Sequence, residues 1–409
     1  MKDWYVGDVA HRWDIIFVED TNISNQIYNS SENDVHVIMI TRGTVTLSDT
    51  NISKSWDSQW NYSDSYWTNS AVFLSGGSLE LNRVNITTDW NDADAIFLSS
   101  DMWLTISDSE FETKWDFSEV IESDNWWTIN IDGGKYTTNW KESPVIYSNG
   151  NVVVDNAELT STQSESIIVE WNGKFVIHNS KLANSNHLNN QSQGNWNIFL
   201  HQTMSDVVSW VAGFAAKDCS ILTNRSDTIF LVDGSAEIFL ENNEIENIDN
   251  TFLRIWAAEW SNLCDVKLNL VNQHIEWDII VDDGCSLNMT FANGSTFLGS
   301  INLDNQSKNI SVDMDENSTW ILNSDSYLSE LNSNVQWYEN INLNWHSLYL
   351  WNEEISSMDG LFQDSKWIAT VELTRDGWHP FSLWILWIGA VVILLVLWAV
   401  LLYSFRRNR

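Results

Sequence analysis

Tryptophan residues at a recurring interval are the feature of this chain that points most directly to chemistry. The regularly placed members are Trp56, Trp90, Trp115 and Trp140. An indole ring offers a flat apolar face on which a sugar ring can lie. Nearby carboxylates could accept hydrogen bonds from sugar hydroxyls, and the candidates are Asp89, Asp92 and Asp116. The pattern suggests a glycan-binding platform, and the alternative is that the rings stack on one another and shield an edge of the fold.

Residues arranged for catalysis are sparse. The pair Asp282-Asp283 resembles the paired aspartates of polygalacturonase-like enzymes, but no Gly-His-Gly follows and no Arg-Ile-Lys occurs. A calcium-assisted lyase would need a basic residue beside acids, for which Arg83 with Asp89 is the one weak candidate. The eight histidines show no metal-binding spacing. We therefore expect no catalytic residue, no metal site and no cofactor beyond weak association with Ca²⁺.

A degenerate repeat determines where these residues would lie. The pentapeptide Asp20-Thr21-Asn22-Ile23-Ser24 returns unchanged at Asp49-Thr50-Asn51-Ile52-Ser53, and aligning the chain on it gives twelve phase positions. The residues four and two before each phase position, and three after it, are apolar in 34 of 36 cases. A composition that is 44% apolar would give about 16 by chance. The repeat of two to three dozen residues predicts a solenoid whose short strands bury one face.

Asp and Asn dominate the phase positions. They are Asp20, Asp49, Asp108, Asn156, Asn179, Asp218, Asn242, Asn272 and Asn293, with Arg83, Gly133 and Glu316 at the other three. These residue types tolerate left-handed backbone angles and suit a bend between strands. The pattern resembles the right-handed parallel β-helix of the pectate-lyase-like superfamily, in which Asn often stacks as a ladder at one corner. The resemblance covers roughly residues 14–330 and implies an all-β solenoid of about twelve turns, but it says little about function.

Cysteine placement predicts one disulfide. Cys264 and Cys285 both lie eight residues before a phase position in adjacent turns, which would bring their Cα atoms to about 4.8 Å. The alternative is a pair of buried thiols that act as small apolar residues. Cys219 lies in another column and is expected to stay unpaired.

The charge balance excludes some partners. The net charge is −36, and removing Arg406, Arg407 and Arg409 from the 20 basic residues leaves 17 − 56 = −39 for the rest of the chain. Such a surface repels nucleic acid and attracts cations, so we expect no nucleic-acid partner.

The C-terminus predicts a membrane span. No charged residue occurs from Pro380 to Phe405, and the stretch is long enough to cross the bilayer as one α-helix. Basic residues follow it, which places the tail 406–409 in the cytoplasm and the rest of the chain outside the cell. Because no signal peptide precedes the repeat, the chain is expected to be part of a longer protein; the alternative is insertion of the tail after synthesis.

These observations predict a membrane-anchored surface protein. Its expected parts are a lead-in (1–13), a β-helix ectodomain (14–331), a membrane-proximal segment (332–379), a transmembrane helix (380–405) and a cytoplasmic tail (406–409). The expected role is structural or adhesive, with carbohydrate or other surface proteins as partners and with N-glycosylation at some of its twelve sequons. A membrane-anchored polysaccharide lyase or glycoside hydrolase is the alternative.

Overall fold

The structure is a computed structural model. It describes residues 4–6, 9–55, 69–99, 103–123, 127–185, 196–202, 210–224, 228–247, 251–257, 264–335 and 338–350. Within these ranges no helix has the length and apolar character that crossing a membrane requires. The predicted span 380–405, the tail 406–409 and Trp56 lie outside the described residues.

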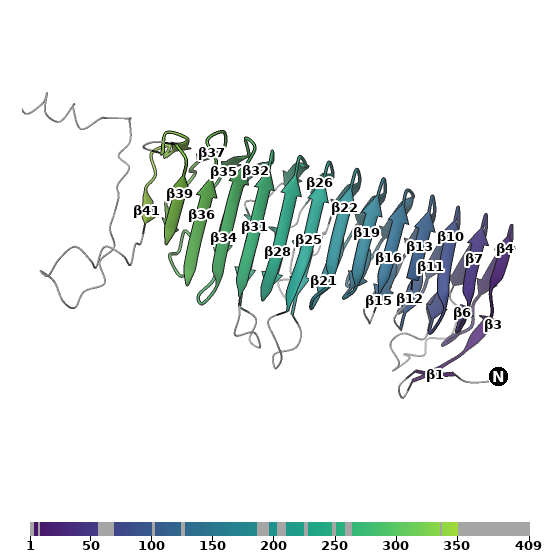
Figure 1. The fold of residues 1–409 in the computed structure, drawn as a ribbon. Helices are drawn as coiled ribbons and strands as arrows, with labels where there is room; N and C mark the ends of the chain where they lie inside the picture. The colour runs from purple at the N-terminus through teal and green to yellow at the C-terminus, as the bar shows by residue number, and fades with distance from the viewer. Residues whose placement is uncertain are drawn as a thin grey trace, which may run out of the picture.

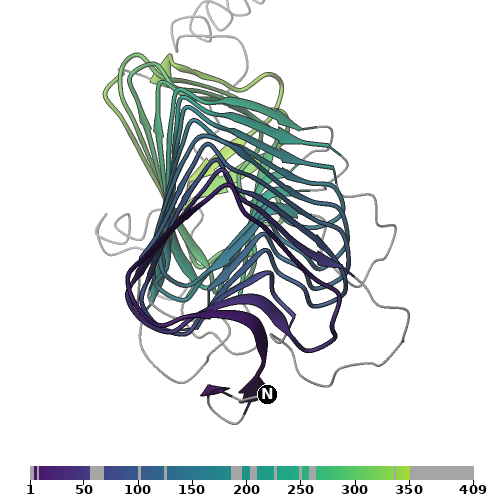
Figure 2. The ribbon, with the colours of Figure 1, turned by 90° about the vertical axis from the view of Figure 1, so that its right-hand side faces the viewer.

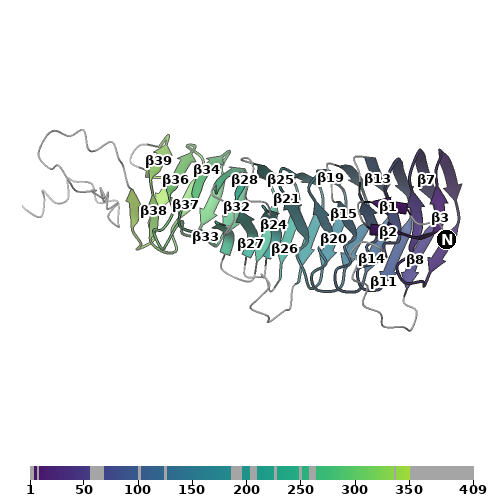
Figure 3. The same cartoon turned by 90° about the horizontal axis from the view of Figure 1, so that it is seen from below.

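The chain forms a parallel β-solenoid of about twelve turns (Figure 1). In a typical turn one strand joins each of three long parallel sheets, and the next strand in each sheet comes from the following turn. The view along the axis shows the turns superposed, with their bends stacked in files (Figure 2). The view from below shows strands of the nine-stranded and eleven-stranded sheets following one another along the rod (Figure 3).

The longest sheet has thirteen strands. In chain order they are β4 (Thr21–Ser24), β7 (Thr44–Ser48), β10 (Ser78–Asn82), β13 (Trp103–Ser107), β16 (Thr128–Asp132), β19 (Asn151–Asp155), β22 (Lys174–His178), β25 (Val211–Lys217), β28 (Ser235–Glu241), β31 (Asp265–Val271), β34 (Ser286–Ala292), β36 (Asn309–Met314) and β39 (Glu330–Ser333).

The nine-stranded sheet follows it around one corner. Its strands are β5 (Ile27–Ser30), β8 (Asn51–Ser55), β11 (Asn85–Asp89), β14 (Glu110–Thr113), β17 (Lys135–Thr138), β20 (Glu158–Ser161), β23 (Lys181–Asn184), β26 (Ser220–Thr223) and β29 (Glu244–Asn247). In later turns the corresponding strands form a separate four-stranded sheet: β32 (His274–Glu276), β35 (Thr296–Leu298), β37 (Thr319–Ile321) and β40 (Ile341–Asn342).

The eleven-stranded sheet completes each turn. Its strands are β3 (Trp13–Phe17), β6 (His36–Ile40), β9 (Val72–Leu74), β12 (Ile96–Leu98), β15 (Ile121–Ser123), β18 (Ile146–Ser148), β21 (Ile167–Glu170), β24 (Trp196–His201), β27 (Thr228–Asp233), β30 (Thr251–Trp256) and β33 (Asp278–Val281). Two short pairs lie at the ends: β1 (Trp4–Val6) with β2 (Val9–His11), and β38 (Ser326–Leu328) with β41 (Leu348–Leu350).

Aliphatic residues stack in files down the interior, as the repeat predicts. Leu79, Leu104, Ile129 and Val152 occupy successive rungs of the thirteen-stranded sheet, and each is at most 1% exposed. The larger of two buried apolar clusters follows the solenoid from Val37 to Leu348. The turns therefore share one core, in which each turn packs on its two neighbours.

The predicted phase residues form the corner between the thirteen-stranded and nine-stranded sheets. Ten consecutive ones have positive φ, from 46° to 75°: Asp49, Arg83, Asp108, Gly133, Asn156, Asn179, Asp218, Asn242, Asn272 and Asn293. Apart from Gly133, which has no side chain beyond hydrogen, all of these residues are exposed at the corner. Two of the contacts between neighbouring turns are Asn156 Nδ2 donating to Asp132 Oδ1 at 2.8 Å and Asn272 Nδ2 donating to Asn242 Oδ1 at 3.1 Å.

The first turn differs from the sequence expectation. Asp20 does not occupy the position equivalent to Asp49; Asn25 does, with φ of 56° and its N–H donating to Ser48 O. The two identical pentapeptides therefore occupy different places in the turn. Ile23 pairs with Leu47 in the thirteen-stranded sheet, whereas Ile52 lies on β8 in the nine-stranded sheet.

Parallel pairing also continues past residue 331. Strand β40 pairs with β37, and β41 pairs with β38. The solenoid thus extends through residues 338–350, which the sequence analysis assigned to the membrane-proximal segment.

Candidate functional site

The tryptophan strip lies where strands of the nine-stranded sheet end. Strands β11, β14 and β17 pair in register, so Trp90, Trp115 and Trp140, each just past its strand, fall in one column. Trp115 and Trp140 are 43% and 39% exposed, with ring centroids 5.8 Å apart and planes tilted by 37°. Trp90 is half-buried. The described part of the strip therefore presents two neighbouring exposed indoles.

Polar groups hold and surround this pair. The Trp115 indole Nε1–H donates to Asp89 Oδ1 at 2.6 Å, which fixes the ring from the preceding turn. Lys141 Nζ lies 3.3 Å from Asp116 Oδ2. Burial, and then the charge of Asp116, raise the pKa of Asp92 to about 6. The strip thus combines aromatic faces with carboxylates whose oxygens can accept hydrogen bonds.

A second group of acids, which the sequence analysis did not identify, lies on the eleven-stranded sheet. Asp94 precedes β12, while Glu119 precedes β15 and Glu122 lies on it. One carboxylate oxygen from each lies within 4.8 Å of the others, and this is the one set among the described residues that could hold a metal ion. We call these three residues the carboxylate cluster.

Burial shapes the acidity of the carboxylate cluster. Asp94 is 2% exposed, and its Oδ1 accepts a hydrogen bond from the Glu119 N–H at 3.0 Å. Burial, with the charges of Glu122 and Glu119, raises the pKa of Asp94 well above its usual value. Burial is also the main reason that the pKa of Glu119 rises to about 7, with Asp92 and Glu165 adding to it. Close buried carboxylates either share protons or bind a cation.

The depth of the carboxylate cluster limits what it can contact. Acids from adjacent turns converge there, Asp94 from one turn and Glu119 and Glu122 from the next. Asp94 is too deeply buried to reach a glycosidic oxygen. A signal for the cluster was present in the sequence, because Asp94 and Glu119 each stand two residues before an apolar strand of adjacent turns.

The other acids considered for catalysis have separate partners. Arg83 Nε binds Asp49 Oδ1 at 2.7 Å, so this arginine belongs to the corner file rather than to a site with Asp89. Asp282 lies on the loop after β33, and its Oδ2 is 3.7 Å from Nη2 of Arg254, which lies on β30. Both contacts lie at the surface, between side chains that are 35–55% exposed.

The cysteines lie as the repeat places them. The structure joins Cys264 and Cys285, whose Cα atoms are 4.7 Å apart in adjacent turns. Cys219 is buried with a free thiol, and its Sγ–H donates to the Ile177 and Lys217 carbonyls.

A buried imidazole pair ties the N-terminal hairpin to the solenoid. His11 Nδ1 lies 2.9 Å from His36 Nε2, and Ser70 Oγ lies 2.7 Å from His36 Nδ1. The Phe73 ring stacks on both imidazoles at 4.3 and 4.5 Å. A histidine next to a serine could act as the base that activates the serine hydroxyl as a nucleophile, but all three side chains are at most 2% exposed, so no substrate reaches them.

Acidification is therefore expected to loosen the first turns. Burial lowers the pKa of His11 to about 4, and burial together with the charges of His11 and Lys54 lowers that of His36. The unfolded chain then binds more protons than the folded one, so stability present above about pH 6.5 is lost as the pH falls toward about 4. Amide hydrogen exchange should accelerate in β6 well before it does in β28. Equal acceleration in both strands would contradict the prediction.

Comparison of the chain with protein-family models, curated proteins and solved structures finds no match. The function must therefore be argued from the geometry described above.

Proposed function

We propose that this chain is a cell-surface protein whose β-helix, right-handed in the sense common to parallel crossovers, presents a glycan-binding strip formed around Trp115 and Trp140. Its role is structural or adhesive, because the strip lies on a rod whose shape is fixed by shared core packing. The acidic surface selects against polyanions, so the proposed ligand is a neutral polysaccharide.

The rest of the proposal concerns the membrane. The uncharged stretch 380–405 would cross it once, with the basic tail 406–409 in the cytoplasm. The solenoid would then face outward, where the disulfide between Cys264 and Cys285 is compatible with an oxidising environment.

The observation that supports glycan binding best is the exposed pair of indoles, one of which is fixed by a hydrogen bond to Asp89 in the preceding turn. Two rings that only shielded an edge would be covered, yet Trp115 and Trp140 remain about two-fifths exposed. The hydrogen bond from Trp115 to Asp89 preorganises one ring, so little side-chain entropy would be lost when a sugar binds.

Replacing both rings should abolish most of the binding. When binding is followed by the backbone chemical shifts of Lys114 and Lys141, which flank the strip in sequence, titration of the intact protein with cellohexaose and xylohexaose is expected to show at least a tenfold weaker affinity at the strip for the Trp115→Ala/Trp140→Ala variant, equivalent to about 1.4 kcal/mol. Trp103→Ala is the matched control, because Trp103 is 66% exposed but lies on β13 of another sheet. Its affinity should be unchanged.

Two results would count against the strip. One is unchanged affinity in the double variant together with a lowered melting temperature, which would mean that the rings serve stability alone. The other is an equal loss of affinity in Trp103→Ala, which would mean that binding does not depend on this column. Release of reducing ends or unsaturated products would instead favour the lyase or hydrolase alternative.

A further inference from the structure

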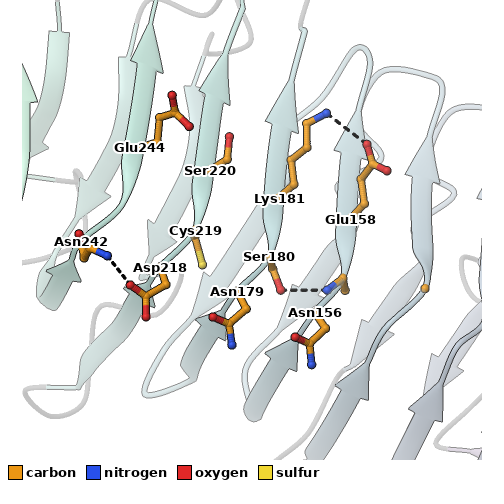
Figure 4. A pocket seen from close by; sticks show the side chains of 12 residues that line it. Asn156, Glu158, Asn179, Ser180, Lys181, Asp218, Cys219, Ser220, Asn242 and Glu244 are labelled. Carbon is orange, nitrogen blue, oxygen red and sulfur yellow. Dashed lines mark hydrogen bonds and ion pairs between the residues drawn. The ribbon is translucent and has the colours of Figure 1, made fainter.

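A groove follows the corner between the thirteen-stranded and nine-stranded sheets. It has a volume of about 790 Å³ and extends over five turns, from Gly134 to Glu244 (Figure 4). Four steps of roughly 4.8 Å between turns make it about 19 Å long. The bottom of the groove is formed by small residues that directly follow the bend, namely Gly134, Ala157, Ser180 and Cys219.

One wall of the groove consists of corner residues with outward side chains. Asn156 donates to Asp132, and Asn242 donates to Asp218. Asn179 lies between these two hydrogen-bonded pairs, and among the described residues its side-chain amide has no hydrogen-bond partner (Figure 4). The file of corner contacts is therefore interrupted at the middle of the groove, where one amide can both donate to a ligand and accept from it.

The opposite wall comes from outward positions of the nine-stranded sheet. Glu158 is bound by two lysines, with Lys181 Nζ 3.2 Å from its Oε1 and Lys135 Nζ 3.4 Å from its Oε2. Ser220 follows in the next turn, and Glu244 in the one after (Figure 4). The wall offers hydroxyl and carboxylate groups, and the carboxylate of Glu158 is balanced by its two lysines.

We propose that this groove is a second binding site, one that takes an extended, neutral polysaccharide chain. Amide, hydroxyl and carboxylate groups at one per turn match a ligand that presents hydroxyls at short regular intervals. The carboxylates of Asp218 and Glu244, with the net charge of −36, disfavour an acidic chain. An extended peptide could add to a sheet only at a free strand edge, whereas this corner joins strands that are already paired on both sides.

The groove is independent of the tryptophan strip. It lies at the corner where the chain enters the nine-stranded sheet, and the strip lies where the chain leaves it. Each site can therefore be disabled without changing the other.

Filling the groove is the direct test. When binding is followed by the chemical shifts of Asn179 in the full chain, titration with cellohexaose and xylohexaose should show affinity at the groove at least tenfold weaker for Ser220→Trp, whose new ring would occupy the groove. Glu110→Trp is the matched control, because Glu110 lies in the same outward column of the nine-stranded sheet but outside the groove. It should bind as the unchanged protein does, and so should Trp115→Ala/Trp140→Ala when the groove is monitored by chemical shifts of Asn179 and Ser220.

A second variant guards against misfolding of the first. Asn179→Gly removes the unpartnered amide while keeping a residue that accepts φ of 47°, and it should also weaken binding severalfold. The proposal is overturned if no neutral oligosaccharide shifts the groove resonances, or if both groove variants bind normally. It is equally overturned if hexagalacturonate or an oligopeptide binds there more tightly than the neutral chains do. Loss of binding only in the double tryptophan variant would support the strip and refute the groove.

Discussion

Leu104→Ala is expected to lower the free energy of unfolding by about 2–5 kcal/mol. Leu104 is fully buried, and it pairs with Leu79 before it and Ile129 after it in the interior file. Removing its side chain would leave a cavity between two turns that cannot close without breaking the register of the sheet. Denaturant unfolding measures the loss of stability, and amide hydrogen exchange shows which strands are destabilised.

Thr105→Ala provides the matched control. Thr105 is the next residue of β13, but it points outward and is exposed, so its replacement should change stability by no more than about 0.5 kcal/mol. Because each turn of a solenoid contacts only its neighbours, the Leu104 variant should show faster exchange in β10, β13 and β16 before distant turns respond. Similar losses from the two variants would contradict the assigned interior face.

The interior files were predictable because every turn imposes the same demands. Most residues that point inward are apolar, and the bend must tolerate a left-handed backbone, which Asn and Asp do better than other non-glycine residues. Both demands recur in each turn. A weak preference at one position therefore becomes a clear pattern over twelve turns. The pattern also tolerates exceptions at the bend, such as Arg83, which has φ of 53° and binds Asp49.

Letter-for-letter identity was a poorer guide than spacing. The segment from Thr21 to Ser24 forms strand β4 before the bend, whereas Asn51 to Ser53 of its copy begin strand β8 (Asn51–Ser55) after the bend. Four or five residues with alternating polarity fit either sheet, so their place is set by the turns above and below. The interval from Asn25 to Asp49 is 24 residues, which agrees better with later turns than the 29 residues from Asp20.

The sites were less accessible to sequence reasoning than the fold. The column of tryptophans follows directly from the repeat, but only the structure distinguishes the exposed Trp115 and Trp140 from the half-buried Trp90. The carboxylate cluster was missed because an acid before a strand is ordinary on a soluble surface. The acidity of such a residue depends on whether it is buried, and the repeat pattern does not predict burial for a polar residue that precedes a strand.

The carboxylate cluster should make stability fall as the pH rises. The folded-state pKa of Glu119 is about 7, against 4.5 for the ordinary group, and that of Asp94 is also raised. The folded chain then holds more protons than the unfolded chain between these values. Stability present below about pH 4.5 is lost as the pH rises through about 7, by an amount on the order of 3 kcal/mol for a shift of this size.

Neutral analogues should remove this dependence. Glu119→Gln and Asp94→Asn are each expected to flatten the fall in melting temperature between about pH 5 and pH 8, whereas Glu110→Gln, at an exposed position of the neighbouring sheet, should not. Millimolar Ca²⁺ at about pH 8 separates two ways of accommodating the ionised carboxylates. If the cluster holds a cation, Ca²⁺ will restore the melting temperature of the unchanged protein but not that of Asp94→Asn. If protons alone stabilise the cluster, Ca²⁺ will change the melting temperatures of the unchanged protein and of Asp94→Asn equally. A pH profile that neither Glu119→Gln nor Asp94→Asn changes would show that these acids are not coupled to folding.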